Sequence, residues 1–126
     1  MHTFEIEGVE HTIDCNAFTP FIYAEEFTVT RKGKEVPEDI NAAVKELVDF
    51  INENDFPPLL RMQQFFWAFE KTANAKLPGF KSWLKALPKA VLALDMEDGG
   101  WAAAVMAEVH DAFFPSHSKS DVAPEA

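Results

Sequence analysis

The chain has 126 residues, which is enough for one domain with a substantial buried core. Apolar residues make up 48% of it and include 12 Phe and 3 Trp, a composition that argues against global disorder. Acidic residues outnumber Lys and Arg by 21 to 11, so the net charge is −10. This charge argues against generic binding to nucleic acids or anionic membranes, because both need a basic surface.

The single cysteine and the first residues bear on the compartment. Cys15 has no second cysteine with which to form an internal disulfide, which fits a reducing environment. The opening residues MHTFEIEG lack a basic stretch followed by an apolar run, so we expect no signal peptide. The sequence therefore predicts a cytoplasmic protein.

Apolar and polar residues alternate on both sides of Gly8, with Phe4 and Ile6 before it and His11 and Ile13 after it. This period of two predicts a small β-hairpin with one buried face. Because two strands alone are marginally stable in water, the hairpin must dock on helices or on another chain.

A short helix and a loop are expected next. Asn16 or Thr19 could cap the helix, and Pro20 fits its first turn. The expected buried face consists of Phe18, Ile22, Tyr23 and Phe27. We expect the polar segment 28–34 to be a loop with, at most, a brief strand at its start.

Two longer helices follow. Pro37, Glu38 and Asp39 open the first, where acidic residues interact favourably with the helix dipole, and residues 52–55 end it. The second covers Pro57–Ala73 and is apolar over most of its circumference, which is typical of a helix in the middle of a core. Its large apolar residues are Leu59, Leu60, Met62, Phe65, Phe66, Trp67 and Phe69. We therefore expect it to be the central helix.

Two further helical segments complete the pattern. Residues 80–91 have helical spacing that Pro88 should kink or split, and residues 101–114 form the final helix. Residues 115–126 have no periodicity and little apolar content, so we expect a disordered tail. The sequence thus predicts a single, mostly helical α+β domain over residues 1–114, with four to five helices and a small N-terminal β-hairpin.

The sequence offers no constellation that indicates catalysis or cofactor binding. The histidines at positions 2, 11, 110 and 117 have no second ligand at metal-binding spacing, and nucleotide-binding motifs are absent. Cys15, at the buried end of a strand, is more typical of packing than of nucleophilic chemistry. The acidic pairs at 25–26 and 38–39 fit a solvated helix face. We expect no catalytic residue, no metal and no cofactor.

Large aromatic side chains are the unusual quantity here, and they point toward binding. The candidate partner contacts among them are Phe66, Trp67, Phe69 and Trp83. A basic stripe with a spacing of four, opposite the next apolar face, consists of Lys81, Lys85 and Lys89. The stripe fits either a solvated helix back or an attachment face for an acidic partner or another copy.

Several short motifs stand in a particular order. After the hairpin comes an N-A-x-T-P-x-x-Y-x-x-x-F segment from Asn16 to Phe27. A Leu-Leu…Trp-Ala helix follows within residues 59–68, and then an aromatic-x-x-Trp-Leu segment from Phe80 to Leu84. Over about residues 3–114 this order resembles the tail assembly chaperones of long-tailed bacteriophages and prophages. The chain departs from the family pattern after Phe27, where a longer basic loop replaces Gly-x-Asp-Leu.

The resemblance implies a non-enzymatic function. Such proteins coat the long, helical tape measure protein before the tail tube polymerises around it, and they tend to self-associate. A longer product, made by translational frameshifting, often recruits the tail tube protein, and this chain would be the short product or the shared N-terminal part. The resemblance also implies a location in the cytoplasm of the bacterial host and absence from the mature virion.

Two alternatives stay open. A small acidic regulatory or antitoxin-like module from a mobile element would form a tight one-to-one complex with a basic partner. A small enzyme that uses Cys15 or a histidine would show rapid alkylation of that cysteine at neutral pH, because reactivity follows thiolate formation.

Overall fold

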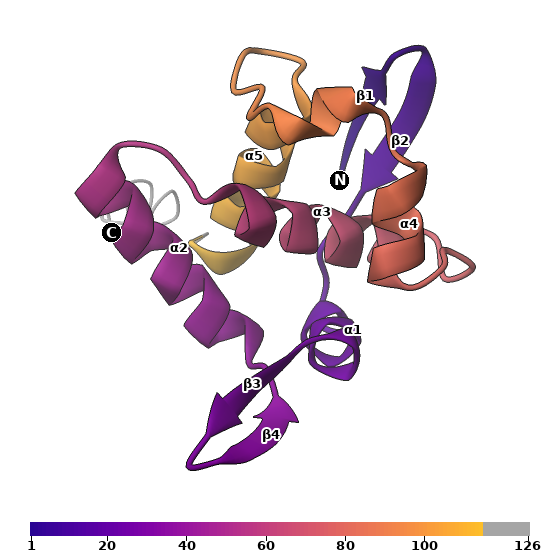
Figure 1. Cartoon of the computed structure of the whole chain (residues 1–126). Helices are drawn as coiled ribbons and strands as arrows, with labels where there is room; N and C mark the ends of the chain where they lie inside the picture. Colours follow the sequence, from indigo (N-terminus) through magenta and orange to yellow (C-terminus); the bar gives the residue numbers. More distant parts are fainter. Residues whose placement is uncertain (115–126) are drawn as a thin grey trace, which may run out of the picture.

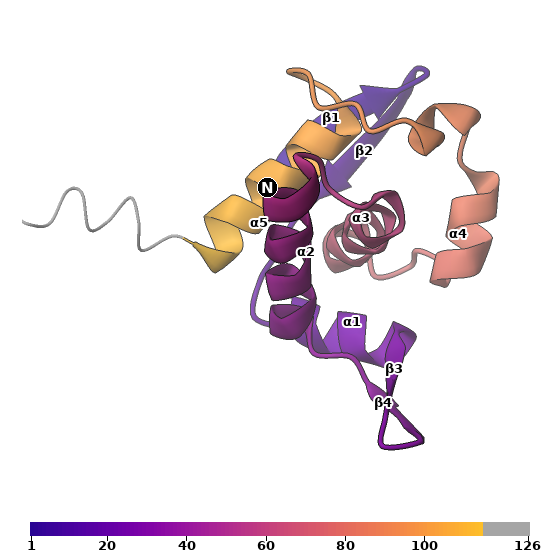
Figure 2. The same ribbon diagram turned by 60° about the vertical axis from the view of Figure 1, so that its left-hand side comes forward.

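Helix α3 (Leu59–Ala73) runs through the middle of the computed structural model, which describes residues 1–114 (Figure 1). The other helices and the first hairpin surround it in a second view (Figure 2). Five of its residues have no exposed surface: Met62, Phe65, Phe66, Ala68 and Phe69. The expected central helix is therefore confirmed, although Leu60 is 57% exposed and does not widen its buried face.

The fold is mostly helical α+β, as predicted. Within residues 1–114 it contains five α-helices, one 3₁₀ helix and two separate two-stranded hairpins. In chain order the remaining elements are β1 (His2–Ile6), β2 (Val9–Ile13), α1 (Thr19–Glu26), β3 (Thr28–Arg31), β4 (Lys34–Pro37), α2 (Ile40–Asn54), α4 (Phe80–Ala86), the 3₁₀ helix η1 (Lys89–Leu92) and α5 (Trp101–Phe113). The expected tail, residues 115–126, lies outside the described residues.

The β1–β2 hairpin has the predicted buried face. Phe4 pairs with His11 across the hairpin, and both side chains are buried. The connection is a two-residue turn in which Glu7 and Gly8 both have positive φ, 49° and 82°, as the right-handed twist of a tight hairpin requires. β2 packs on α3 and β1 on α5, so the hairpin docks on helices of its own chain.

The segment after α1 is a second hairpin: the brief strand expected at its start is present as β3, but the expectation of a loop for the rest of the segment is wrong, because a second strand, β4, follows the turn. β3 pairs antiparallel with β4, with Val29 opposite Val36, and Lys32 and Gly33 form the turn with φ of 52° and 77°. Because most of its side chains are exposed on both faces, this hairpin lacks the polar–apolar alternation that reveals a half-buried strand. It projects from the rest of the protein in both ribbon views (Figures 1 and 2).

Helix α1 begins without a side-chain cap. Phe18 is the N-cap residue, while Asn16 Oδ1 accepts a hydrogen bond from the Phe18 N–H and Thr19 Oγ1 accepts one from the Asn16 N–H. Phe18 was expected on the buried face but is exposed, and its ring packs instead on Phe21, 5.1 Å away. The fully buried Thr19 takes the core position at this end of the helix.

The remaining helices begin and end close to the predicted positions. Asp39 caps α2 by accepting a hydrogen bond from the Ala42 N–H, and Asp55 ends it in the left-handed conformation. The segment 80–91 is split as expected, because Pro88 has extended backbone between α4 and η1. α5 ends at Phe113, one residue before the predicted end.

Candidate functional site

The four aromatic residues expected to contact a partner lie in the core. Each is at most 5% exposed; they are Phe66, Trp67, Phe69 and Trp83. The ring of Phe66 lies 4.9 Å from that of Trp83 and 5.5 Å from that of Trp101, so its faces are already covered. Because neighbouring elements cover the aromatic face of α3, that face stabilises the fold itself, whereas Leu60 of the same helix stays exposed. We therefore correct the expectation: in this conformation these four aromatic side chains offer no surface to a partner.

The three lysines of the predicted stripe are exposed but do not share one helix. Lys81 and Lys85 lie on α4, whereas Lys89 opens η1 beyond the extended Pro88. No ion pair involves any of them within residues 1–114. They stay available to an acidic partner, but over two short elements and not as one continuous face.

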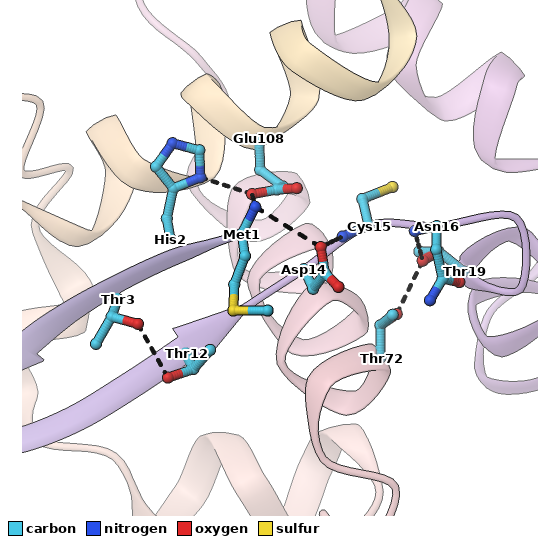
Figure 3. Close-up of polar contacts among 10 residues, drawn as sticks. All are labelled: Met1, His2, Thr3, Thr12, Asp14, Cys15, Asn16, Thr19, Thr72 and Glu108. Atoms are coloured by element: carbon cyan, nitrogen blue, oxygen red, sulfur yellow. Dashed lines mark hydrogen bonds and ion pairs between the residues drawn. The ribbon is translucent and has the colours of Figure 1, made fainter.

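Cys15 lies in a polar turn after β2, shown in Figure 3. Its backbone N–H donates to Asp14 Oδ1 at 3.0 Å, and the neighbouring Thr19 Oγ1 shares a hydrogen bond with Thr72 at 2.9 Å. Burial raises the pKa of the Cys15 thiol to about 11, although a hydrogen bond with Thr19 opposes the shift. The thiol is therefore protonated at neutral pH, which disfavours a role as nucleophile.

A buried carboxylate anchors the first strand near Cys15. Glu108 on α5 is buried, and one of its oxygens lies 2.6 Å from His2 Nδ1 and 3.5 Å from the amino group of Met1 (Figure 3). These contacts join β1 to α5 and supply the partners that a buried carboxylate needs.

His11 is buried and has a structural partner. His11 Nδ1 lies 3.1 Å from Glu70 Oε2, and Glu70 Oε1 accepts a hydrogen bond from Trp83 Nε1 at 3.0 Å. Through these two contacts Glu70 of α3 joins His11 of β2 and Trp83 of α4. Over residues 1–114, three or more His, Cys, Asp or Glu side chains nowhere gather in a way that could hold a metal ion.

A surface hollow lies between α2, α3 and the start of β3, and we call it the α2–α3 groove. Its volume is about 400 Å³. Apolar side chains in its lining are Val29, Leu47, Phe50, Pro58 and Leu60. Polar side chains in its lining are Thr28, Glu38, Glu46, Arg61 and Gln64. Leu60 is the most exposed apolar side chain of this groove.

Arg61 organises the polar side of the groove. Its Nη1 donates to Tyr23 Oη at 2.7 Å and to Gln64 Oε1 at 3.0 Å, and lies 2.9 Å from Glu38 Oε2. Its Nη2 donates to Glu46 Oε1 at 2.8 Å. One guanidinium thus holds side chains from α1, α2 and α3 together, and the two carboxylates leave the groove with a net charge of −1.

Tyr23 has a structural role in this network. Its side chain is fully buried and receives the Arg61 N–H. Burial raises the pKa of its hydroxyl well above the ordinary value, although the Arg61 charge opposes the shift. The hydroxyl therefore stays protonated and donates to Gln64 Oε1, at 3.3 Å.

Sequence reasoning missed this groove. Glu38 was expected on a solvated helix face together with Asp39, but its side chain is buried beneath Arg61, 23 residues away. The available signal was Arg61 itself, a cation on a helix that is otherwise apolar around most of its circumference. A cation at such a position requires a buried or half-buried acidic partner.

Comparison with known proteins identified no relative. No family model matches the chain, and neither a curated protein nor a solved structure matches it. None of the helices within residues 1–114 has the length and apolar character needed to cross a membrane.

Proposed function

We propose that this chain is a non-enzymatic tail assembly chaperone that binds the tape measure protein and keeps it soluble while the tail tube assembles. The observation that carries the proposal is the α2–α3 groove, an open hollow with an exposed apolar wall on a protein of net charge −10. The order of sequence motifs, which resembles that of the tail assembly chaperones, supplies the identity of the client.

The groove suits the apolar side of an amphipathic helix. Leu60 is exposed at its rim and Phe50 is half-buried beside it, so a docked helix would remove the apolar surface of both from water. Helix-in-groove binding works in this way, with apolar side chains of the ligand helix at spacings of three and four as anchors. The remaining acidic surface keeps the loaded complex soluble.

The proposal includes the wider role of the family that the sequence resembles. The chain associates with itself, and a longer product made by frameshifting brings the tail tube protein to the loaded tape measure protein. Assembly takes place in the cytoplasm of the bacterial host, and the chaperone is absent from the mature virion.

Co-expression with the tape measure protein of the same gene cluster tests the proposal. We expect the chain to raise the soluble fraction of that client and to copurify with it in several copies, as measured by light scattering coupled to size-exclusion chromatography. L60D, which places a charge on the apolar wall, should abolish the effect. L92D is the matched control, because Leu92 is also an exposed leucine, 67% against 57% for Leu60, and lies on η1 outside the groove.

Two results would contradict the proposal. If the client stays insoluble in the presence of the wild-type chain, the proposed chaperone function is wrong. If L60D and L92D have equal effects on client solubility, the α2–α3 groove is not the binding site. A strict one-to-one complex with a basic partner in place of the client would favour the antitoxin-like module.

A further inference from the structure

The β3–β4 hairpin has one strand edge that is free to pair. The Glu38 N–H donates to Phe27 O at 2.9 Å and so extends the hairpin ladder by one pair. Paired residues of an antiparallel ladder alternate between hydrogen-bonded and non-hydrogen-bonded positions. Val29 and Arg31 consequently direct their N–H and C=O groups toward β4, whereas Thr28 and Thr30 direct theirs away from it.

These outward groups are accessible. Thr28 and Thr30 are both exposed, and their N–H groups have no partner outside the hairpin within the described part of the chain. Threonine favours strand conformation, and neither position carries a charge. An unpaired edge of this kind is a template for another strand.

The other strand edges of the two hairpins are protected. On β4 the outward positions are Glu35 and Pro37, and proline has no N–H to donate. In the β1–β2 hairpin the outward positions are Thr3 and Glu5 on one strand and Glu10 and Thr12 on the other, so each edge carries one glutamate. Charged side chains and proline are common means of blocking strand addition. β3 is therefore the one edge among these four strands whose outward positions carry neither a charge nor a proline.

We propose that two copies of this chain pair antiparallel through β3 and form a four-stranded sheet. In the symmetric register Thr28 of one copy lies opposite Thr30 of the other, so the outward N–H and C=O groups of both residues are satisfied. Val29 then lies opposite its equivalent in the second copy. Since Val29 also pairs with Val36 within each hairpin, one face of the joined sheet carries a continuous row of four valines.

Charge complementarity supports a second copy as the occupant. The basic tip, residues 31–34, carries Arg31, Lys32 and Lys34, and no ion pair involves these side chains within residues 1–114. Antiparallel pairing carries this tip of each copy to the start of β3 in the other, where Glu25 and Glu26 end α1. The two-fold symmetry forms this contact twice. The local attraction opposes the general repulsion between two chains of charge −10.

This pairing gives a surface to the self-association included in the proposed function, and in that respect it rests on that proposal. Thr28 and Val29 also line the β3 end of the α2–α3 groove, so the pairing covers that end and leaves the wall formed by Leu60 and Phe50 to the client. L60D changes this wall and leaves β3 unchanged, so client binding can be tested apart from pairing.

Sedimentation velocity over a concentration series tests the pairing with two proline variants. T30P removes an outward N–H from β3, and E35P removes the outward N–H of the residue opposite it on β4. Both leave the internal ladder intact, so they are matched in their effect on the hairpin. We expect the wild-type chain and E35P to dimerise alike and T30P to raise the dissociation constant by at least about tenfold.

A charge exchange tests the register independently of the backbone. K32E and E25K should each weaken the dimer, more so at low salt, and the double variant K32E/E25K should restore it. Glu is tolerated at this turn position, because Glu7 occupies the same place in the first hairpin with nearly the same φ.

A wild-type chain that stays monomeric, or equal dissociation constants for T30P and E35P, would overturn the pairing. Failure of the double charge variant to restore the dimer would overturn the register. These outcomes are distinct from failure of the proposed function, which is measured as the solubility of the client with the wild-type chain and L60D.

Discussion

The carboxylate of Glu38 lies 2.9 Å from the guanidinium of Arg61, and it is the more buried of the two groups. Glu38 precedes α2 and Arg61 lies on α3, so this ion pair joins two helices at the α2–α3 groove. A buried carboxylate at such a site depends on its cation, because burial limits the water that could replace the lost partner.

Replacement of the cation should therefore be costly. We expect R61M to lower the free energy of unfolding by about 3 kcal/mol, because it leaves the Glu38 charge buried and unpaired. The double variant E38Q/R61M should recover much of this loss, since a neutral amide is cheaper to bury than a carboxylate. Urea denaturation followed by circular dichroism measures both. An R61M protein as stable as the wild type would show that Glu38 gains other partners or water.

Trp67 tests the assignment of the central aromatic residues to the core. The side chain is 2% exposed, and its Nε1 donates to Pro78 O at 2.9 Å. We expect W67A to cost roughly 3–5 kcal/mol of stability in urea denaturation, through lost burial and a cavity. L60A, on the exposed side of the same helix, should change stability by less than about 0.5 kcal/mol. If the W67A protein were as stable as the wild type but no longer bound the client, Trp67 would belong to the binding surface and not to the core.

The elements with one buried face could be predicted from the sequence. Alternation around Gly8 identified the first hairpin, the wide apolar circumference of residues 57–73 identified the central helix, and Pro88 marked the division between α4 and η1. Each of these signals has a local cause, namely a side-chain period or a backbone constraint, and a local cause can be read from neighbouring residues.

The features that could not be predicted depend on contacts between residues far apart in the sequence, or on which apolar face is covered in the folded protein. The β3–β4 hairpin has little buried face, so no period of two reveals it. Glu38 is buried because Arg61, far along the chain, lies over it. Periodicity placed Trp67 and Trp83 on apolar helix faces but could not distinguish a core from an interface, because both consist of the same residue types.

Cys15 should react slowly with alkylating agents. Burial raises the pKa of its thiol from 9.0 to about 11, and a difference of two pH units lowers the thiolate population at neutral pH by about 100-fold. We expect modification by iodoacetamide to be correspondingly slower in the folded protein than in urea, with a rate that keeps rising up to about pH 11. Rapid modification at pH 7 would revive the enzyme alternative.

The same shift makes the stability depend on pH in the alkaline range. A folded-state pKa above the unfolded value means that the unfolded chain releases the Cys15 proton first as pH rises. This contribution to stability is therefore complete below pH 9.0 and is lost between pH 9.0 and about 11. The difference in unfolding free energy between the wild type and C15A should shrink across this window. A constant difference would show that the thiol has the same pKa in both states.

Gly100, the N-cap residue of α5, leaves no room for a side chain. A Cβ at this position would lie 2.5 Å from the backbone oxygen of Asp95, which itself accepts hydrogen bonds from the Ala102 and Ala103 N–H groups at the start of the helix. The backbone at Gly100 has φ −79°, which any residue can adopt, so the constraint is steric and not conformational.

We expect G100A to destabilise the protein by about 1–3 kcal/mol in urea denaturation, because Asp95 must move and weaken the cap of α5. G99A is the control for backbone effects. Gly99 has φ +86° and open space around it, so alanine there meets only conformational strain of roughly 1 kcal/mol. A G100A protein as stable as G99A would contradict this expectation. It would show that Asp95 can move without a measurable loss of stability from its hydrogen bonds to the Ala102 and Ala103 N–H groups.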